Sequence, residues 1–314
     1  KYFLWAKTSQ CPRCAISNDL FPGYLVAEDV RHPKNVLLCE HCGALNEFPM
    51  VPTKDKPSRC KDCKKPVSVE GSAKRKHVSC KSCNYEYNYM STITDSPLNH
   101  RMFAIEYHCS QCKPSHDGRF FKKPDELDLK KFESSRNLLK KISPPIPQEE
   151  IPAGDETDRL HRWGYFRYRD MFNERQLLGL GLLLQKISKL ASEEVRYALL
   201  TVFSDILRYQ NLLCRYDTYA LKCQDIFSVH GFPVGLVQCE NNILGIPKVG
   251  SGSFRHFVEK YIRAKDYCSN PFETLHVGKV KRIIPIVGET IEAEITNKFP
   301  EGSKRQASIL AAPA

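Results

Sequence analysis

This sequence lacks the features that a membrane-spanning or secreted protein needs. Its longest apolar run, residues 177–184, is far shorter than the roughly 20 residues that a helix needs to cross a bilayer. No charged, apolar and small-residue signal pattern precedes residue 20. The chain also starts at Lys1 with no Met, so we expect an internal piece of a longer protein. These absences predict a soluble protein without a membrane partner.

The cysteines lack the distribution of a secreted disulfide scaffold. Ten of the 14 cysteines form five Cys-x-x-Cys pairs before residue 113. Such usage is typical of proteins that bind zinc in a reducing compartment, and redox pairs would come singly beside a βαβ unit. The pattern therefore predicts a cytoplasmic protein with zinc as its cofactor.

The five pairs predict structural zinc sites. Two Cys-x-x-Cys hairpins can place four thiolates at about 2.3 Å from one zinc, which leaves no open coordination position for a catalytic water. The 17 residues between Cys42 and Cys60 and the 25 between Cys83 and Cys109 both fit zinc ribbons. We expect at least two zinc ions, bound by Cys11, Cys14, Cys39, Cys42, Cys60, Cys63, Cys80, Cys83, Cys109 and Cys112.

An odd number of pairs leaves the pairing open. The fifth pair can recruit histidine, with Cys109, Cys112 and His116 in a C-x2-C-x3-H arrangement, or the pairs can combine out of sequence order. The four remaining cysteines lack the spacing of a metal site, and we expect them to be small buried apolar residues. They are Cys214, Cys223, Cys239 and Cys268.

The fold class predicted is α+β, with a small-β zinc-ribbon region, a mainly helical region and a C-terminal β-hairpin. Asn173 with Gln176 has the spacing of a helix capping box, and Ser192 suits the start of a second helix that should pack against the first. The predicted divisions are tandem zinc ribbons at 1–118, a helix and proline-rich linker at 119–158, a helical domain at 159–278, and a hairpin at 279–314 that turns at residues 287–289.

Positive charge is concentrated in the ribbon region. The chain carries a net charge of +11, and residues 51–90 hold ten basic side chains against four acidic ones. A basic patch binds polyanions by neutralising phosphates, although runs of lysine are often only solvated surface. DNA is the predicted partner, and the candidate contacts are Lys64, Lys65, Lys74, Arg75 and Lys76.

Four segments carry a resemblance to a known family. They are residues 2–8 (YFLWAKT), 117–124 (DGRFFKKP), 171–178 (MFNERQLL) and 203–211 (FSDILRYQN). In their order along the chain they resemble the zinc-ribbon-containing adenine-specific DNA methylases of prokaryotic restriction and phage-defence systems. The resemblance covers nearly all of the sequence.

The resemblance implies a parent enzyme that transfers a methyl group from S-adenosylmethionine to N6 of a flipped adenine. In that family a Gly-rich segment upstream binds S-adenosylmethionine, and an Asp-Pro-Pro-Tyr downstream binds the adenine. Neither motif occurs in this sequence, since Pro144-Pro145 lies in the proline-rich linker. We therefore expect no catalytic or cofactor-binding residues here, S-adenosylmethionine as cofactor of the full-length parent only, and a DNA-recognition and scaffold role, with other defence-system subunits as candidate partners.

Two other readings stay open at this stage. The chain can belong to a non-enzymatic zinc-ribbon protein that binds nucleic acid, or its ribbons can dock a partner such as a nuclease or a helicase.

Overall fold

Helices and strands both form in this chain, as expected for the α+β class. The computed structural model describes residues 1–109, 111, 116, 118–247, 250–288, 294–296 and 306–308. Two units are distinguished, Lys1–Glu259 and Lys260–Ala314, and each is described by itself. Among the described residues, no helix is both long enough and apolar enough to cross a membrane.

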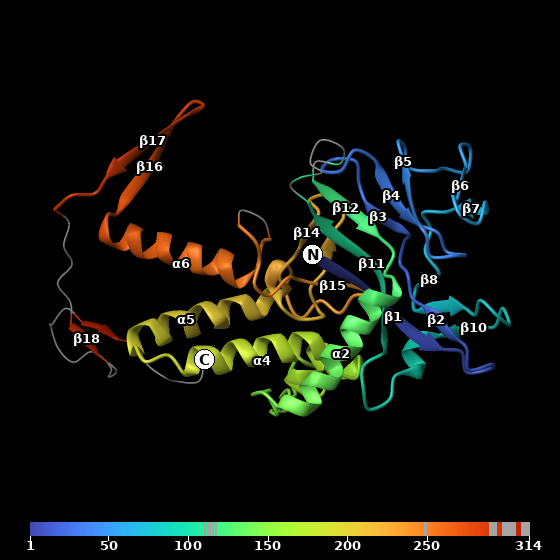
Figure 1. The fold of residues 1–314 in the computed structure, drawn as a ribbon, viewed down its shortest axis with the longest axis horizontal. Helices are drawn as coiled ribbons and strands as arrows, with labels where there is room; N and C mark the ends of the chain where they lie inside the picture. Colours follow the sequence, from blue (N-terminus) through green and yellow to red (C-terminus); the bar gives the residue numbers. More distant parts are fainter. Residues whose placement is uncertain are drawn as a thin grey trace. The chain divides into compact units, whose positions relative to one another are not determined.

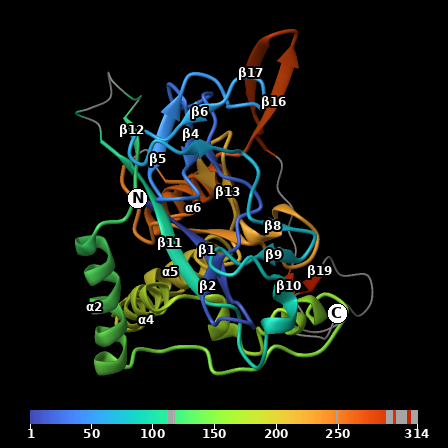
Figure 2. The ribbon, with the colours of Figure 1, turned by 90° about the vertical axis from the view of Figure 1, so that its right-hand side faces the viewer.

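The larger unit is built on an antiparallel sheet whose strands come from distant parts of the sequence. Its order is β12 (Arg119–Lys122), β11 (His100–His108), β1 (Tyr2–Gln10) and β15 (Val237–Glu240). The end of β1 also pairs with β2 (Ser17–Asp19). Figure 2 shows β11 alongside β1. The first and last thirds of this unit are therefore joined by backbone hydrogen bonds.

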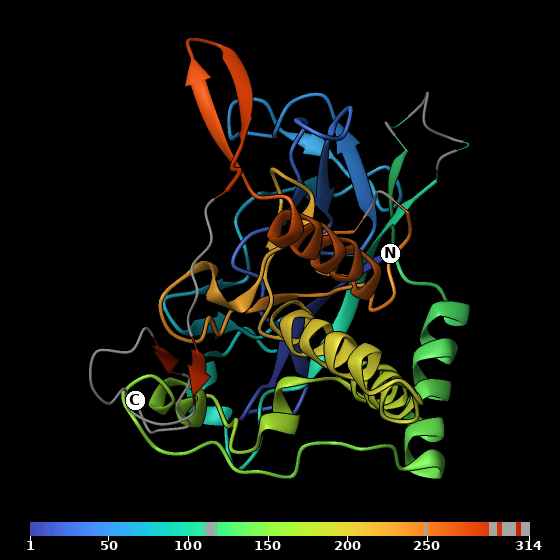
Figure 3. The ribbon, with the colours of Figure 1, turned by 90° about the vertical axis from the view of Figure 1, so that its left-hand side faces the viewer.

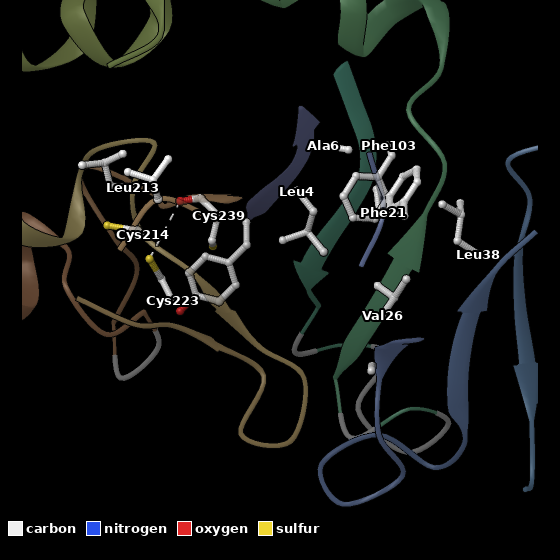
Figure 4. Close-up of a cluster of buried hydrophobic side chains, with 14 of the residues drawn as sticks. Leu4, Ala6, Phe21, Val26, Leu38, Phe103, Leu213, Cys214, Cys223 and Cys239 are labelled. Carbon is white, nitrogen blue, oxygen red and sulfur yellow. Dashed lines mark hydrogen bonds between the residues drawn. The ribbon is translucent and has the colours of Figure 1, made fainter. Parts of the chain in front are cut away.

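The main apolar core lies against this sheet. Leu4 and Ala6 on β1 pack with Phe103 on β11 and with side chains of the segment that ends in β15, including Cys239. Figure 4 shows Leu4 and Ala6 together with Phe103 and, on the other side, the Cys239 group. Because β1 is buried along most of its length, the fold depends on covering both faces of this strand.

The ribbon region consists of short antiparallel strands. One three-stranded sheet has the order β3 (Leu25–Ala27), β4 (Asn35–Leu38), β5 (Leu45–Phe48). A second has the order β10 (Glu86–Asn88), β9 (His77–Ser79), β8 (Ala73–Lys74), and β6 (Ser58–Arg59) pairs with β7 (Pro66–Val67). Apart from the main core, the described residues of this region form two small buried clusters, and each contains cysteines of the Cys-x-x-Cys pairs.

The helices begin where the sequence predicts. Asn173 caps α4 (Glu174–Ser188) in a reciprocal capping box with Gln176, and Ser192 caps α5 (Glu193–Ile206). The two helices pack together, and α4 also packs against α2 (Glu126–Ile142), as Figure 3 shows. The predicted pairing of α4 with α5 is confirmed.

The apolar stripe along α2 is only partly buried. Leu139 packs into a cluster with α4, and the ring of Phe132 lies 4.9 Å from the ring of Trp5. Leu127 and Ile142, which the periodicity places on the same stripe, are 60 % and 40 % exposed. They lie in the first and last turns of the helix, beyond the part that α4 and Trp5 cover.

Short elements complete the larger unit. They are α3 (Asp158–Arg162), the 3-10 turns η1 (Tyr89–Thr92), η2 (Tyr168–Met171), η3 (Leu207–Tyr209) and η4 (Ile226–Ser228), and the strands β13 (Tyr216–Asp217) and β14 (Lys222–Cys223). The expected boundary at residue 118 lies inside this unit, because β11 before it pairs with β12 after it.

The smaller unit holds most of α6 (Phe254–Ser269) and a hairpin of β16 (Phe272–Val277) and β17 (Val280–Pro285), all labelled in Figure 1. The hairpin turns at Gly278, whose φ of 61° suits glycine. The turn expected at residues 287–289 stays a prediction, because Glu289 lies outside the described residues. β18 (Glu294–Thr296) pairs in parallel with β19 (Gln306–Ser308), and Ile291 and Ala293 lie outside the described residues.

Candidate metal centres

Four Cys-x-x-Cys pairs occupy the same kind of loop, which we call a knuckle. In each, the first cysteine directly follows one strand, and the two flanking strands are antiparallel. The strand registers place Gln10 opposite Ser17, Leu38 opposite Leu45, Arg59 opposite Pro66, and Ser79 opposite Glu86. A six-residue loop therefore separates the paired residues in all four knuckles.

The residue after the second cysteine closes each knuckle. It is Ala15, Gly43, Lys64 or Asn84, and its φ lies between 55° and 71°. Its backbone N–H donates to the carbonyl of the first cysteine at 2.8 to 3.0 Å. This left-handed residue reverses the chain so that both thiols of a knuckle point the same way.

The knuckles combine into two tetrads. Tetrad 1 contains Cys11, Cys14, Cys80 and Cys83, and tetrad 2 contains Cys39, Cys42, Cys60 and Cys63. Opposed sulfur atoms lie 3.7 and 3.5 Å apart in tetrad 1, and 3.6 Å apart twice in tetrad 2. Four thiolates around zinc at about 2.3 Å would lie about 3.8 Å apart, whereas a disulfide requires about 2.05 Å. Both tetrads can therefore hold a metal ion, and zinc fits their donor atoms.

Backbone N–H groups favour the thiolate form at one position of each tetrad. N–H groups of Cys83 and Ser82 lower the pKa of the Cys80 thiol to about 6, although burial opposes the shift. Burial raises the pKa of the Cys60 thiol, but N–H groups of Cys63 and Asp62 outweigh it and bring the pKa to about 6. Because a metal binds the thiolate, these hydrogen bonds prepare both sites for a cation.

Two asparagines that our sequence reasoning missed brace the tetrads. The amide oxygen of Asn18 accepts from the backbone N–H of Lys81, and that of Asn46 accepts from the N–H of Lys61. Each asparagine lies four residues after the second cysteine of one knuckle and reaches the opposite knuckle of its tetrad. The repeated spacing C-x2-C-x3-N in only the first two pairs was the signal available in the sequence.

The same asymmetry recurs within each tetrad. The knuckles at Cys60 and Cys80 have Val67 and Tyr87 at the position of the asparagine, and both side chains are buried. Each tetrad therefore joins one knuckle that supplies an asparagine to one that supplies an apolar residue. The predicted ribbon of Cys42 with Cys60 is confirmed, whereas the 25-residue spacing from Cys83 to Cys109 does not mark a shared site, because Cys80 and Cys83 face Cys11 and Cys14.

The fifth pair differs from the four knuckles. His108 lies opposite Arg119, and the backbone N–H of Cys109 donates to the carbonyl of Gly118 at 2.8 Å, so its loop holds four more residues. Cys109 is half-buried, and Cys112 lies outside the described residues. His116, the histidine of the predicted C-x2-C-x3-H arrangement, lies 3.2 Å from a carboxylate oxygen of Glu47.

Three of the four remaining cysteines are buried apolar residues, as expected. Burial raises the pKa of the thiols of Cys214, Cys223 and Cys239, which keeps them protonated. Cys268 is exposed, so the expectation of burial is wrong for it, since it lies on the solvent side of the last turn of α6.

The five predicted DNA contacts are all exposed and lie at loop tips of the two tetrad regions. Lys64 and Lys65 belong to the Cys60 knuckle, and the ammonium of Lys64 donates to the carbonyl of Lys61 at 2.6 Å. Lys74 pairs with Glu70 at 2.5 Å. Arg75 and Lys76 form the two-residue turn between β8 and β9.

Comparison with known proteins gives no family for this chain. No family model, no curated protein and no solved structure matches it.

Proposed function

We propose that this chain is a DNA-binding scaffold segment whose N-terminal region is held together by two structural zinc ions. Each tetrad supplies four thiolates, so a zinc ion bound there has no open position for substrate or water. Because the buried clusters around the tetrads are small, the metal is needed for this region to fold. The zinc fixes loops that present positive charge.

The observation that carries the DNA-binding role is the Arg75-Lys76 turn. Both residues have positive φ, 48° and 71°, in a two-residue hairpin turn where Asn-Gly is the preferred sequence. Left-handed backbone costs an L-residue about 1 to 2 kcal/mol. Neither side chain forms an ion pair with any residue that the structure describes. A strained turn that holds two unpaired cations at an exposed tip suits contact with phosphates.

The proposed parent is an S-adenosylmethionine-dependent DNA adenine-N6 methyltransferase of a prokaryotic restriction or phage-defence system, acting in the cytoplasm. This step rests on the sequence resemblance alone. In such a parent the chain would bind DNA around the target adenine and position the two catalytic halves, since it contains neither the Gly-rich nor the Asp-Pro-Pro-Tyr motif. The non-enzymatic alternative is a zinc-ribbon adaptor with the same DNA contacts.

The DNA contact can be tested without weakening the turn. The double substitution Arg75→Asn and Lys76→Gly removes both charges and installs the preferred turn sequence, so lost binding cannot be assigned to lost folding. Each phosphate contact contributes about 0.9 to the log-log salt slope, and we expect the slope for duplex DNA to flatten by about 2. Anisotropy titrations of zinc-loaded protein at several salt concentrations give this slope.

Lys130→Ala with Lys131→Ala is the matched control, because it removes two exposed charges from α2 and leaves the ribbons intact. An equal loss of slope in this control would show only a general effect of net charge. An unchanged slope in the turn variant would indicate that the turn does not contact DNA. The candidates would then be Arg255, Arg263 and Lys265 on α6, or a protein-docking role for the ribbons.

The methyltransferase assignment has its own test. These 314 residues alone should neither incorporate radiolabelled methyl groups into DNA nor bind S-adenosylmethionine measurably, whereas the full-length parent should do both. Methyl transfer by the isolated chain would show that the active site has been misplaced. A full-length reading frame without the two flanking motifs would favour the adaptor.

A further inference from the structure

Three side chains outside the tetrads converge on one point beside the β4–β5 hairpin. They are His32, Glu47 on β5, and His116. One ligand atom from each lies within 4.8 Å of the others. His32 is fully buried at its side chain, while Glu47 and His116 are 36 % and 26 % exposed. The cluster is therefore buried at His32 and accessible to solvent at Glu47 and His116.

His32 is oriented by its surroundings. Its Nδ1 lies 2.7 Å from the carbonyl oxygen of Lys34, closer than the 3.4 Å to the backbone N–H of the same residue, so we assign Nδ1 as a donor. The ring is held edge-to-face against Phe121, with centroids 5.5 Å apart. A histidine that donates one ring N–H to a backbone carbonyl has the arrangement common among metal-ligating histidines.

The other nitrogen of His32 has no hydrogen-bond partner among the described residues. This nitrogen, Nε2, is buried and lies 3.8 Å from a carboxylate oxygen of Glu47. In the neutral ring this nitrogen carries a lone pair, which faces a negatively charged oxygen. A cation between the two atoms would turn this repulsion into two attractive contacts, whereas a buried polar atom without a partner is destabilising.

His116 completes the group from the segment between β11 and β12. Its Nε2 lies 3.2 Å from the same oxygen of Glu47, and its buried Nδ1 has no hydrogen-bond partner in the part of the chain that the structure describes. The second oxygen of Glu47 lies 3.8 Å from the ammonium of Lys34. One carboxylate oxygen therefore lies near both imidazoles, while the other lies near the solvent-exposed ammonium of Lys34.

We propose that His32, Glu47 and His116 form a third metal site, which binds a divalent transition metal such as zinc with two imidazoles and one carboxylate. This donor set differs from the tetrads in two ways. Imidazole and carboxylate bind zinc less tightly than four thiolates, and three protein ligands leave a coordination position for water or another ligand. The third ion is therefore the exchangeable one.

The site would fasten His116, near the end of the Cys109 loop, to β5 beside tetrad 2. Counted from the second cysteine of its pair, His116 occupies the position that Asn18 and Asn46 have in the first two knuckles. In those knuckles the residue braces a tetrad through a backbone hydrogen bond. In the fifth pair the same position supplies a metal ligand. This inference is independent of DNA binding and of the methyltransferase assignment.

Cobalt substitution separates the three sites in the full chain. Co²⁺ bound to thiolates gives intense sulfur-to-metal charge-transfer absorption, whereas a site of two imidazoles and a carboxylate does not. We expect three Co²⁺ ions in the wild-type protein, two of them in the tetrads. Glu47→Gln and His32→Gln should each bind two, with the thiolate absorption unchanged. His77→Gln is the control, because this histidine also faces a backbone carbonyl, at 3.1 Å from that of Arg75, but belongs to none of the three ligand groups found in the described residues.

Two results would overturn the proposal. One is wild-type protein that binds only the two thiolate-ligated ions under saturating Co²⁺. The other is Cys109→Ser losing the third ion while Glu47→Gln retains it, which would assign that ion to the fifth cysteine pair. Because Glu47 is partly exposed, its substitution by Gln keeps the test valid even where loss of the buried His32 prevents folding.

Discussion

The two tetrads have the same local geometry, but they join different parts of the molecule. Tetrad 2 brings together Cys39 and Cys63, which are 24 residues apart in the sequence, whereas tetrad 1 brings together Cys11 and Cys83, which are 72 residues apart. Tetrad 1 also lies at the end of β1, the strand that pairs with both β11 and β15. Tetrad 2 therefore stabilises a local ribbon, and tetrad 1 secures the end of the central sheet.

The largest expected effect would come from breaking each tetrad separately. Structural zinc contributes about 10 to 16 kcal/mol in zinc-finger peptides, comparable with the whole stability of a domain at about 5 to 15 kcal/mol. Cys80→Ser should speed amide hydrogen exchange in β1, β11 and β15, because it frees the β1–β2 end of the sheet. Cys60→Ser should speed exchange only between β3 and β7. Equal exchange in β1 in both variants would remove the distinction between the tetrads.

A smaller effect is expected from Lys7, which lies on β1 in the apolar core. Its side chain is fully buried, its ammonium lies 2.6 Å from the hydroxyl of Tyr165, and burial lowers its pKa to about 7. The unfolded chain binds more protons than the native one between this value and the usual pKa of 10.5, so stability should rise with pH in that window.

Urea unfolding of zinc-loaded protein at pH 7 and pH 8.5 measures this effect. The free energy of unfolding should increase by at most about 2 kcal/mol over this range through Lys7. Lys7→Met should lose that pH dependence and be more stable at pH 7, because no charge has to be buried. Burial lowers the pKa of His100 well below 6.5, so this histidine stays neutral throughout the pH range of the measurement. The same slope in both proteins would mean that Lys7 is charged in the native state.

The sequence predicted local features better than long-range ones. The helix caps at Asn173 and Ser192 follow from short spacings and are confirmed. The first four cysteine pairs also follow from short spacings, and they form two tetrads that could hold a metal ion. The pairing of Cys11 with Cys83 depends on the path of β1, which no spacing reveals. The hairpin turn at Gly278 was missed because alternation further along the chain was the stronger pattern.

The hydrogen bonds of Asn18 and Asn46 to the opposite knuckles could be predicted from the sequence only in part. The C-x2-C-x3-N spacing was visible, but its meaning depends on which knuckle lies opposite. The site at His32 could not be read from the sequence, because its three residues come from segments that only the folded ribbon brings together. His116 alone had a recognisable spacing, and the sequence assigned it to a different set of ligands.

The central claim is that the knuckles pair as Cys11/Cys14 with Cys80/Cys83 and Cys39/Cys42 with Cys60/Cys63. Counting thiolate-bound ions by their Co²⁺ charge-transfer absorption tests it directly. Cys11→Ser, Cys80→Ser and the double variant of both should each lose one of the two ions, because both residues belong to one site. Cys60→Ser with Cys80→Ser should lose both ions. If Cys11→Ser with Cys80→Ser lost two thiolate-bound ions, the two knuckles would serve different metals and the pairing would be contradicted.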